Sequence, residues 1–299
     1  MLIGAHVSTA GGLLNAHERG VERGCEAIQV FNQSPRMWRP TSWKDDDIAA
    51  FRELMEDGPI RSVVIHAVYL INCASPDREV RKKSIASLTH ALRMGDAIGA
   101  DGVVVHPGST LGEPHEEAIG RAGQAFTEAL AESESCLLLL EDTAGGGNTL
   151  GRDFGELTSL IDAADAHERI GLCLDSCHLF ASGFDISDAR KLAGVIDDCV
   201  EQIGIDRLRC LHVNDSKTPL GSNSDRHAVP GDGHLGDKGC AAFLSEPRFE
   251  GLPALFEGPG AEGGAPGRVD VDKTNALRKK GLAARSRAGR TPRRPRARR

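Results

Sequence analysis

The chain has 299 residues, 40% of them hydrophobic and 26% charged, and this ordinary composition excludes a disordered or fibrous protein. No run approaches the roughly 18 consecutive apolar residues of a membrane helix, and residues 1–12 lack the basic and long apolar regions of a secretory signal. The net charge of −7 is unevenly spread: residues 278–299 hold eleven Lys or Arg and no acidic residue, so residues 1–277 carry 25 basic and 43 acidic side chains. A body this acidic does not favour nucleic acid over its whole surface, although a local patch could still bind it.

Eight short apolar runs predict buried β-strands. They cover residues 2–5, 27–31, 63–65, 103–105, 137–140, 171–174, 208–211 and 254–256. Longer, charge-rich amphipathic stretches lie between them and predict helices, the clearest at residues 45–55, 77–98, 116–131, 153–164 and 187–203. This alternation indicates an α/β fold with parallel strands, and eight repeats favour closure into a (β/α)8 TIM barrel.

The pattern weakens towards the end of the chain. Residues 258–267 are rich in Gly and Pro, and residues 270–282 have only a fair helical pattern. We therefore expect one barrel domain over residues 1–283, followed by a basic, disordered tail over residues 284–299. Because the body is acidic, such a tail could act as a cationic arm that speeds encounter with DNA.

Six of the eight apolar runs end in a side chain that can bind a metal ion. These residues are His66, His106, Glu141, Asp175, His212 and Glu257, and His6 adds a seventh polar residue after the first run. The carboxyl ends of barrel strands converge on one mouth, where active sites are built. Carboxylates and imidazoles crowded there would repel or compete unless cations held them, so the sequence predicts a metal site.

Three further candidate ligands lie in loops. His178 follows Asp175 by three residues, and Asp225 and His227 lie beyond the seventh run. The nine candidates contain five His, two Asp and two Glu, which suits zinc, manganese or iron with open positions for water and substrate. Nine ligands exceed the needs of two ions and match three if one carboxylate is shared.

Other titratable residues predict no site. His17, His90, His115 and His167 lie on expected helices or loops and are interpreted as surface residues. The eight cysteines contain no CxxC pair, which indicates buried free thiols in a reducing cytoplasm. Residues 231–236 match GxGxxG formally, but they follow no strand, so a dinucleotide site is not expected.

Several short motifs, in order along the chain, resemble the endonuclease IV family of apurinic/apyrimidinic (AP) endonucleases. They are IGAHVS at residues 3–8 with Gly11-Gly12, YLIN at 69–72, HPGS at 106–109, EDTAG at 141–145, CLDSCH at 173–178, HVNDSK at 212–217, and Gly221-Ser222 followed by DRH at 225–227.

The resemblance implies a (β/α)8 barrel that holds three zinc ions. It assigns the first ion to His66, His106 and Glu141, the second to Glu141, Asp175, His212 and Glu257, and the third to His178, Asp225 and His227. It also implies hydrolysis of duplex DNA on the 5′ side of abasic sites, which leaves a 3′-hydroxyl and a 5′-deoxyribose phosphate, and removal of blocking groups from 3′ ends.

The matching positions for loop residues that enter the DNA minor groove are Arg36, Tyr69 and Leu70. The missing secretory signal and membrane span predict a cytoplasmic protein that does not bind membranes, and a monomer is expected as typical of the family.

The chemistry of the nine candidate ligands also suits phosphodiester hydrolysis, independently of the family resemblance. Phosphodiester hydrolysis needs a nucleophile, neutralised phosphoryl oxygens and a stabilised leaving oxygen, and clustered metal ions supply all three. Either Glu141 or Glu257 could act as the catalytic carboxylate that orients or deprotonates the attacking water, and the sequence does not choose between them.

Two other functions compete with this interpretation. Metal-dependent sugar isomerases use the same barrel with carboxylates and His at strand ends, but they need two ions and no ligand set like His178, Asp225 and His227. A non-enzymatic protein that binds damaged DNA through its basic tail is the second alternative, and the complete set of nine candidate ligands argues against it.

Overall fold

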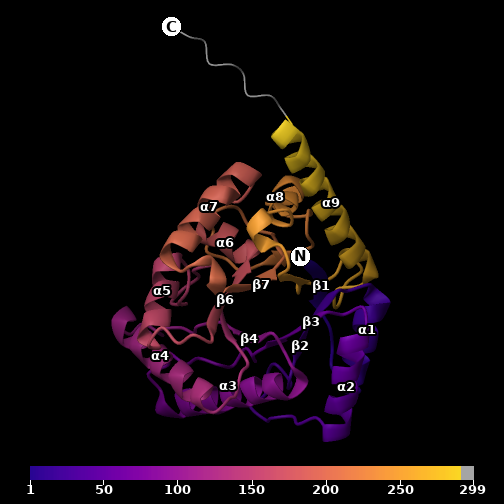
Figure 1. Cartoon of the computed structure of the whole chain (residues 1–299). Helices are drawn as coiled ribbons and strands as arrows, with labels where there is room; N and C mark the ends of the chain where they lie inside the picture. The colour runs from indigo at the N-terminus through magenta and orange to yellow at the C-terminus, as the bar shows by residue number, and fades with distance from the viewer. Residues whose placement is uncertain (291–299) are drawn as a thin grey trace.

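The computed structural model describes residues 1–290 and contains a closed barrel of eight parallel strands surrounded by helices (Figure 1). The barrel strands are β1 (Leu2–His6), β2 (Ala27–Phe31), β3 (Ser62–His66), β4 (Gly102–Val105), β5 (Leu138–Glu141), β6 (Ile170–Asp175), β7 (Leu208–His212) and β10 (Pro253–Phe256). They pair in chain order, and β10 closes the ring between β7 and β1. The (β/α)8 fold predicted from the sequence is confirmed, and each predicted strand is present.

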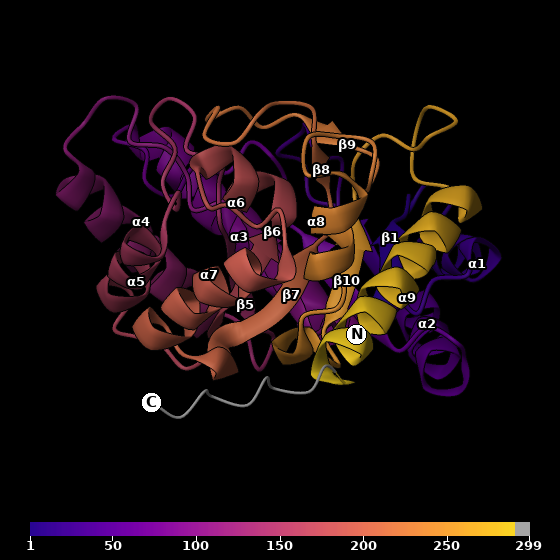
Figure 2. The same cartoon turned by 90° about the horizontal axis from the view of Figure 1, so that it is seen from above.

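Helices cover the outside of the barrel (Figures 1 and 2). They are α1 (Leu13–Arg23), α2 (Asp45–Asp57), α3 (Arg78–Ile98), α4 (His115–Ala131), α5 (Phe154–Ala163), α6 (Ser176–Ser182), α7 (Ala189–Gln202), α8 (Gly236–Phe243) and α9 (Arg268–Arg290), with short 3₁₀ helices η1 (Ile205–Arg207) and η2 (Pro247–Phe249). The strand periodicity did not predict the small antiparallel hairpin of β8 (Asp215–Ser216) and β9 (His227–Ala228) beyond β7. None of the helices within residues 1–290 is long and apolar enough to cross a membrane.

The core has two layers because alternate strand residues face the inside and the outside of the barrel. The inner layer consists of Ala27, Val64, Val104, Leu139, Cys173, Cys210 and Leu255, all fully buried. The larger outer layer packs the strands against the helices. All eight cysteines are free and buried, as expected from the sequence.

Local signals set the helix ends. Asp77, Asp153 and Asp188 each accept backbone N–H groups from the first turn of the following helix, which satisfies donors that have no partner within the helix. Gly24 and Gly99 end α1 and α3 in the left-handed conformation with φ of 73° and 69°, a backbone geometry that glycine adopts without steric cost.

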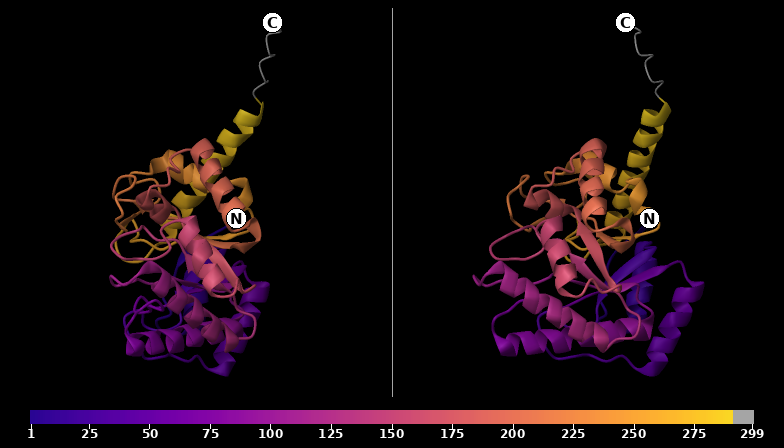
Figure 3. Two further views of the ribbon diagram at one scale, coloured as in Figure 1. Left: turned by 90° about the vertical axis from the view of Figure 1, so that its left-hand side faces the viewer. Right: turned by 60° about the vertical axis from the view of Figure 1, so that its left-hand side comes forward.

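The predicted start of the tail is wrong by seven residues, because α9 continues to Arg290. Arg278 bonds to Glu250, and Arg285 to Glu246 at 2.9 Å, while the Ala, Lys and Arg of this segment favour helix formation. These contacts lie beside the amino ends of β1 and β10, so the last turns of α9 project on the face opposite the carboxyl ends of the strands (Figures 2 and 3). The rest of the predicted tail, residues 291–299, lies outside the described residues.

The prediction that His17 is a surface residue is also wrong. His17 is only 7% exposed and shares the inward face of α1 with Leu13, Ala16 and Gly20. Its ring meets Phe51 edge-on at 6.4 Å, and burial lowers its pKa. The sequence pattern set no bounds for α1, so it did not show which face of the helix His17 shares. His90 and His167 are half-buried and His115 is exposed.

Asp96 joins the end of α3 to the loop that leads into β5. Its carboxylate accepts the N–H groups of Glu134, Ser135 and Cys136 at 2.7–2.8 Å. Burial opposes ionisation, but these N–H groups outweigh it and lower the pKa of Asp96. A depressed pKa means that the carboxylate stabilises the fold above the pKa of the unfolded chain and that this contribution is lost as the pH falls.

We expect Asp96→Ala to lower the free energy of unfolding by about 1–2 kcal/mol at neutral pH. Urea unfolding of metal-free protein at several pH values measures this difference, which should shrink as the pH falls below about 4, because the unfolded chain then binds a proton that folded Asp96 takes up only at lower pH. The exposed Asp198→Ala on α7 is the control and should change stability little. A pH-independent difference for Asp96→Ala would contradict the electrostatic explanation.

Candidate metal centre

The carboxyl ends of the strands place most of the nine candidate ligands at one mouth. His66, Glu141, Asp175 and His212 are the last residues of β3, β5, β6 and β7. His106 and Glu257 directly follow β4 and β10. Parallel register brings these ends together; for example, Asp175 pairs with His212 across β6 and β7.

Two loops complete the ligand set. The Asp175 side chain caps α6 by accepting the N–H groups of Cys177 and His178 at 2.6 and 3.1 Å. The first turn of α6 therefore holds His178 beside the strand end. In the β8–β9 hairpin, Ser216 pairs with His227, which brings His227 over the mouth together with Asp225, two residues before it in the chain.

The nine side chains form three groups whose ligand atoms lie within 4.8 Å of one another. We call them the first, second and third clusters. They comprise His66, His106 and Glu141; Glu141, Asp175, His212 and Glu257; and His178, Asp225 and His227.

Glu141 belongs to both the first and the second cluster. Its Oε2 lies 3.4 Å from His66 Nε2 and 3.0 Å from His106 Nε2. Its Oε1 lies 2.8 Å from His212 Nδ1. The two oxygens of one fully buried carboxylate thus face different groups of ligands, which is the arrangement of a bridging carboxylate.

The other candidate ligand atoms are separated by distances similar to those around Glu141. His212 Nδ1 lies 3.3 Å from Glu257 Oε2, and Asp225 lies 3.3 Å from His178 Nε2 and 3.0 Å from His227 Nε2. Ligands at about 2 Å from a tetrahedral zinc ion lie roughly 3.3 Å apart. The spacing of these side chains therefore fits ions of that size between them.

The imidazole rings are held by bonds that orient them for metal binding. His66 Nδ1 donates to the Ala67 carbonyl at 2.6 Å, His178 Nδ1 to the Asp142 carbonyl at 2.9 Å, and His212 Nε2 to Gln29 Oε1 at 2.8 Å. In each ring the other nitrogen, with its lone pair, faces the carboxylates. Such outer hydrogen bonds fix the tautomer and orientation of metal-binding histidines.

Opposite charges in the site shift one another's pKa values. Burial favours the neutral form of His212, but Glu257 and Glu141 outweigh it and raise its pKa well above the ordinary value. Burial likewise opposes ionisation of Glu141, but His212 and His106 hold its pKa well below the ordinary value. Glu141 Oε2 and His227 Nε2 are nonetheless buried without a hydrogen bond. Buried ligand atoms without a hydrogen bond, in a dense group of imidazoles and carboxylates, fit a site for cations.

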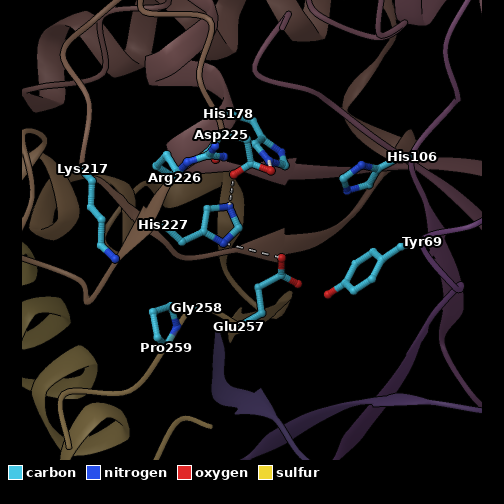
Figure 4. Close-up of a pocket in the computed structure, with 10 residues that line it drawn as sticks. All are labelled: Tyr69, His106, His178, Lys217, Asp225, Arg226, His227, Glu257, Gly258 and Pro259. Atoms are coloured by element: carbon cyan, nitrogen blue, oxygen red, sulfur yellow. Dashed lines mark hydrogen bonds and ion pairs between the residues drawn. The ribbon is translucent and has the colours of Figure 1, made fainter. Parts of the chain in front are cut away.

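A cavity of about 410 Å³ opens over the site and is lined by residues of all three clusters (Figure 4). Figure 4 shows Lys217 and Arg226 on one side of it and Tyr69 on the other, with the Tyr69 hydroxyl directed towards Glu257. Desolvation of this hydroxyl, with the carboxylates of Glu257 and Glu141, raises the pKa of Tyr69 to about 12. The mouth therefore offers cations on one side and a protonated phenol on the other.

The three residues expected to contact DNA lie near this mouth. Tyr69 is 61% exposed, Arg36 is exposed, and Leu70 is half-buried against the core. A backbone bond of 3.2 Å from Tyr69 N–H to the Pro35 carbonyl joins the loops that carry Arg36 and Tyr69.

Sequence reasoning missed several supporting residues. Gln29 donates to Glu257 at 2.7 Å as well as bonding His212, and Asn214 donates to Asp175 at 2.6 Å. One signal was available for Gln29: it is the only polar residue in the apolar run of β2. Lys217 and Arg226 were also missed, although Arg226 lies between two predicted ligands.

The GxGxxG match at residues 231–236 has a structural role. The Asp215 carboxylate is fully buried and accepts N–H groups from Gly231, Gly233, Leu235 and Gly236 at 2.8–3.1 Å. A Cβ atom at Gly233 would lie 2.3 Å from the Ser216 carbonyl oxygen, so only glycine permits this close approach. The loop therefore wraps a carboxylate of the chain itself, in agreement with the expectation that it binds no dinucleotide.

Comparisons with known proteins agree with the fold. Residues 18–280 match the family described as xylose isomerase-like TIM barrel. The chain is 39% identical over 259 residues to a protein of Geotalea daltonii named probable endonuclease 4, covering 86% of this chain and 91% of the relative. It is 38% identical over 280 residues to a protein of the same name from Halothermothrix orenii, covering 93% of this chain and 100% of the relative. The crystal structure of endonuclease IV from Thermus thermophilus superimposes with a TM-score of 0.81 and 34% identity, covering 95% of this chain and 100% of that one.

Proposed function

The chain belongs to the endonuclease IV family of xylose isomerase-like TIM barrels, and from this premise we propose that it is a metal-dependent AP endonuclease. It hydrolyses the phosphodiester on the 5′ side of an abasic site in duplex DNA and leaves a 3′-hydroxyl and a 5′-deoxyribose phosphate. It also removes blocking groups from 3′ ends. Three zinc ions per chain are its cofactors.

The observation that carries this proposal is the shared carboxylate of Glu141. Its two oxygens face the first and the second cluster, and the third cluster lies close by, with His178 Nδ1 3.3 Å from Glu141 Oε1. Hydrolysis of a phosphodiester requires that several oxygens of one phosphate be held at once, and three adjoining groups of imidazoles and carboxylates can place a cation near each of them. Bound zinc ions would supply a nucleophilic water at neutral pH and neutralise charge on the phosphoryl and leaving oxygens.

The chain's own residues position the substrate around this centre. Lys217 and Arg226 line the cavity and can bind the phosphates that flank the reacting one. Glu257 is held by Gln29 at 2.7 Å with its other oxygen towards His227 at 4.0 Å (Figure 4). Glu141 is fully buried, whereas Glu257 lines the cavity. We therefore assign the orientation of the attacking water to Glu257 and the bridging role to Glu141.

The sugar isomerase alternative explains less of the site. An isomerase that holds two ions would use the first and second clusters, but it gives no role to His178, Asp225 and His227. It also gives none to the cations Lys217 and Arg226 at the mouth.

The proposal is tested by mapping the cleavage of a duplex that contains one abasic site. We expect a single cut 5′ to the site, a product with a 3′-hydroxyl, loss of cleavage after chelation and recovery on adding zinc. The same duplex without the abasic site is the control. Isomerisation of a sugar without cleavage of this duplex would favour the alternative, and binding without cleavage would favour a non-enzymatic role.

Tyr69 provides a prediction for substrate binding. Its ring is exposed at the mouth and packs edge-on against His66 at 5.7 Å and Phe31 at 5.3 Å. A planar ring at this position can fill the gap left by a missing base. We expect Tyr69→Ala to weaken binding to an abasic duplex about tenfold and to leave zinc content unchanged. Tyr69→Phe, which keeps the ring, is the control. Loss of zinc in Tyr69→Ala would show that the ring supports His66 instead.

We further propose that the enzyme acts as a monomer in the cytoplasm. Eight buried free thiols support a reducing compartment. Residues 1–290 form one domain in this proposal.

A further inference from the structure

Three exposed apolar side chains follow three consecutive strands of the barrel. Among the described residues, the most exposed large hydrophobic side chains are Tyr69 and Leu111, each 61% exposed, and Met37, 53% exposed. They lie in the loops after β2, β3 and β4, at the carboxyl ends of neighbouring strands. We call Met37, Tyr69 and Leu111 the apolar edge. Exposed apolar side chains are common singly, but three on adjacent loops of one mouth indicate a contact surface.

Hydrogen bonds join these three loops. The Asn72 side chain, in the Tyr69 loop, accepts the Ser109 N–H and donates to the Ser109 carbonyl, both at 3.0 Å. Ser109 lies two residues before Leu111. On the other side, the Tyr69 N–H donates to the Pro35 carbonyl in the loop that carries Met37. The apolar edge is therefore held as one unit.

The backbone of Leu111 gives an independent reason to expect a function. Its φ is +53°, a left-handed conformation that a leucine adopts only at a cost in free energy. A side chain that is mostly exposed recovers little of this cost by packing. Strain of this kind persists where the position of a side chain is needed for function.

The charges of the mouth show what this edge would contact. Lys217 and Arg226 lie across the cavity from Tyr69 (Figure 4). A duplex over the metal centre would thus place phosphates against the cations and its minor groove, with sugars and base edges, against the apolar edge. Apolar side chains that enter a minor groove partly unstack its base steps and kink the duplex, which is easiest where a base is missing.

We propose that Leu111 is a DNA-contacting residue that inserts beside Tyr69 into the minor groove at the abasic site. The inference rests on the proposed endonuclease function and extends it to the β4–α4 loop. Leu111 favours abasic over intact duplex, because the side chain can enter the gap left by a missing base without the free-energy cost of unstacking an intact base step.

The test replaces Leu111 with Asn, which removes the apolar side chain and tolerates left-handed backbone better than leucine. We expect unchanged or increased thermal stability and unchanged zinc content. Affinity for an abasic duplex should fall about tenfold, and affinity for the intact duplex should fall less. Leu111→Gly, which needs no strained backbone, should behave in the same way.

The matched control is Leu282→Asn, because Leu282 is 40% exposed on the part of α9 that lies at the opposite face. It should leave both affinities unchanged. Equal binding of abasic duplex by wild type and both Leu111 variants, with wild type still cleaving it, would overturn this inference alone. A change of oligomeric state without a change in DNA affinity would also overturn it, in favour of a contact between two copies of the chain. Failure of wild type to cleave abasic duplex would instead overturn the proposed function.

Discussion

Replacing Glu141 with Gln should remove metal from two clusters at once. The carboxylate faces His66 and His106 with one oxygen and His212 with the other, whereas an amide offers one oxygen and an N–H₂ group that repels a cation. We expect the purified variant to contain at least two zinc ions fewer than wild type, those of the first and second clusters. Cleavage of abasic duplex should fall by at least about a hundredfold, a loss that even outer-shell changes at metal sites can reach.

Asp225→Asn is the informative comparison for this prediction. Asp225 lies only in the third cluster and is half-exposed, so its loss should affect one ion and leave the other two in place. Elemental analysis and single-turnover cleavage of both variants measure the difference. Equal zinc loss in Glu141→Gln and Asp225→Asn would contradict the bridging role of Glu141.

Replacing Asp215 with Asn should destabilise the segment after β7, which carries the candidate ligands Asp225 and His227 and the loop of residues 231–236. Four backbone N–H groups from residues 231–236 and the N–H of Ser216 bond to this buried carboxylate. Asn has a single acceptor oxygen, and its N–H₂ group would face the donors of Gly231, Gly233 and Gly236. We expect the free energy of unfolding to fall by about 3 kcal/mol and zinc in the third cluster to be lost first, because Asp215 opens the hairpin in which Ser216 pairs with His227.

Asp232→Asn is the control that tests whether the loss of stability and zinc is specific to the buried carboxylate of Asp215. Asp232 lies in the same loop, is exposed, and forms a surface ion pair with Lys273 at 2.6 Å. Such a pair contributes at most about 1 kcal/mol. Urea unfolding and zinc content should therefore change little. An equal loss of stability in both variants would show that the loop tolerates no change of charge and that the N–H bonds to Asp215 are not decisive.

The barrel and the convergence of the candidate ligands could be predicted because both follow from local patterns. Short apolar runs are buried on both faces in a parallel sheet, and their carboxyl ends must meet, so His66 and His212 could be placed together although 146 positions separate them in the sequence. The resemblance of the motifs to the endonuclease IV family then grouped the ligands, and the structure brings the same nine side chains into the same three clusters.

The parts that escaped prediction depend on contacts between distant segments. Gln29 bonds His212 and Glu257 from another strand, and no pattern near residue 29 reveals these partners. The hairpin of β8 and β9 is two residues long on each side, too short for a periodic signal. The end of α9 depends on Glu246 and Glu250, which bond Arg285 and Arg278; without those partners the composition of the same segment is typical of a basic tail.

We propose that three adjoining clusters hold three ions that act together on one phosphodiester. It is tested most directly by adding zinc stepwise to metal-free protein while bound zinc and cleavage of an abasic duplex are measured on the same samples. We predict that binding saturates near three zinc ions per chain and that full cleavage appears only as the third ion binds. Full cleavage before the third zinc ion binds would overturn this proposal.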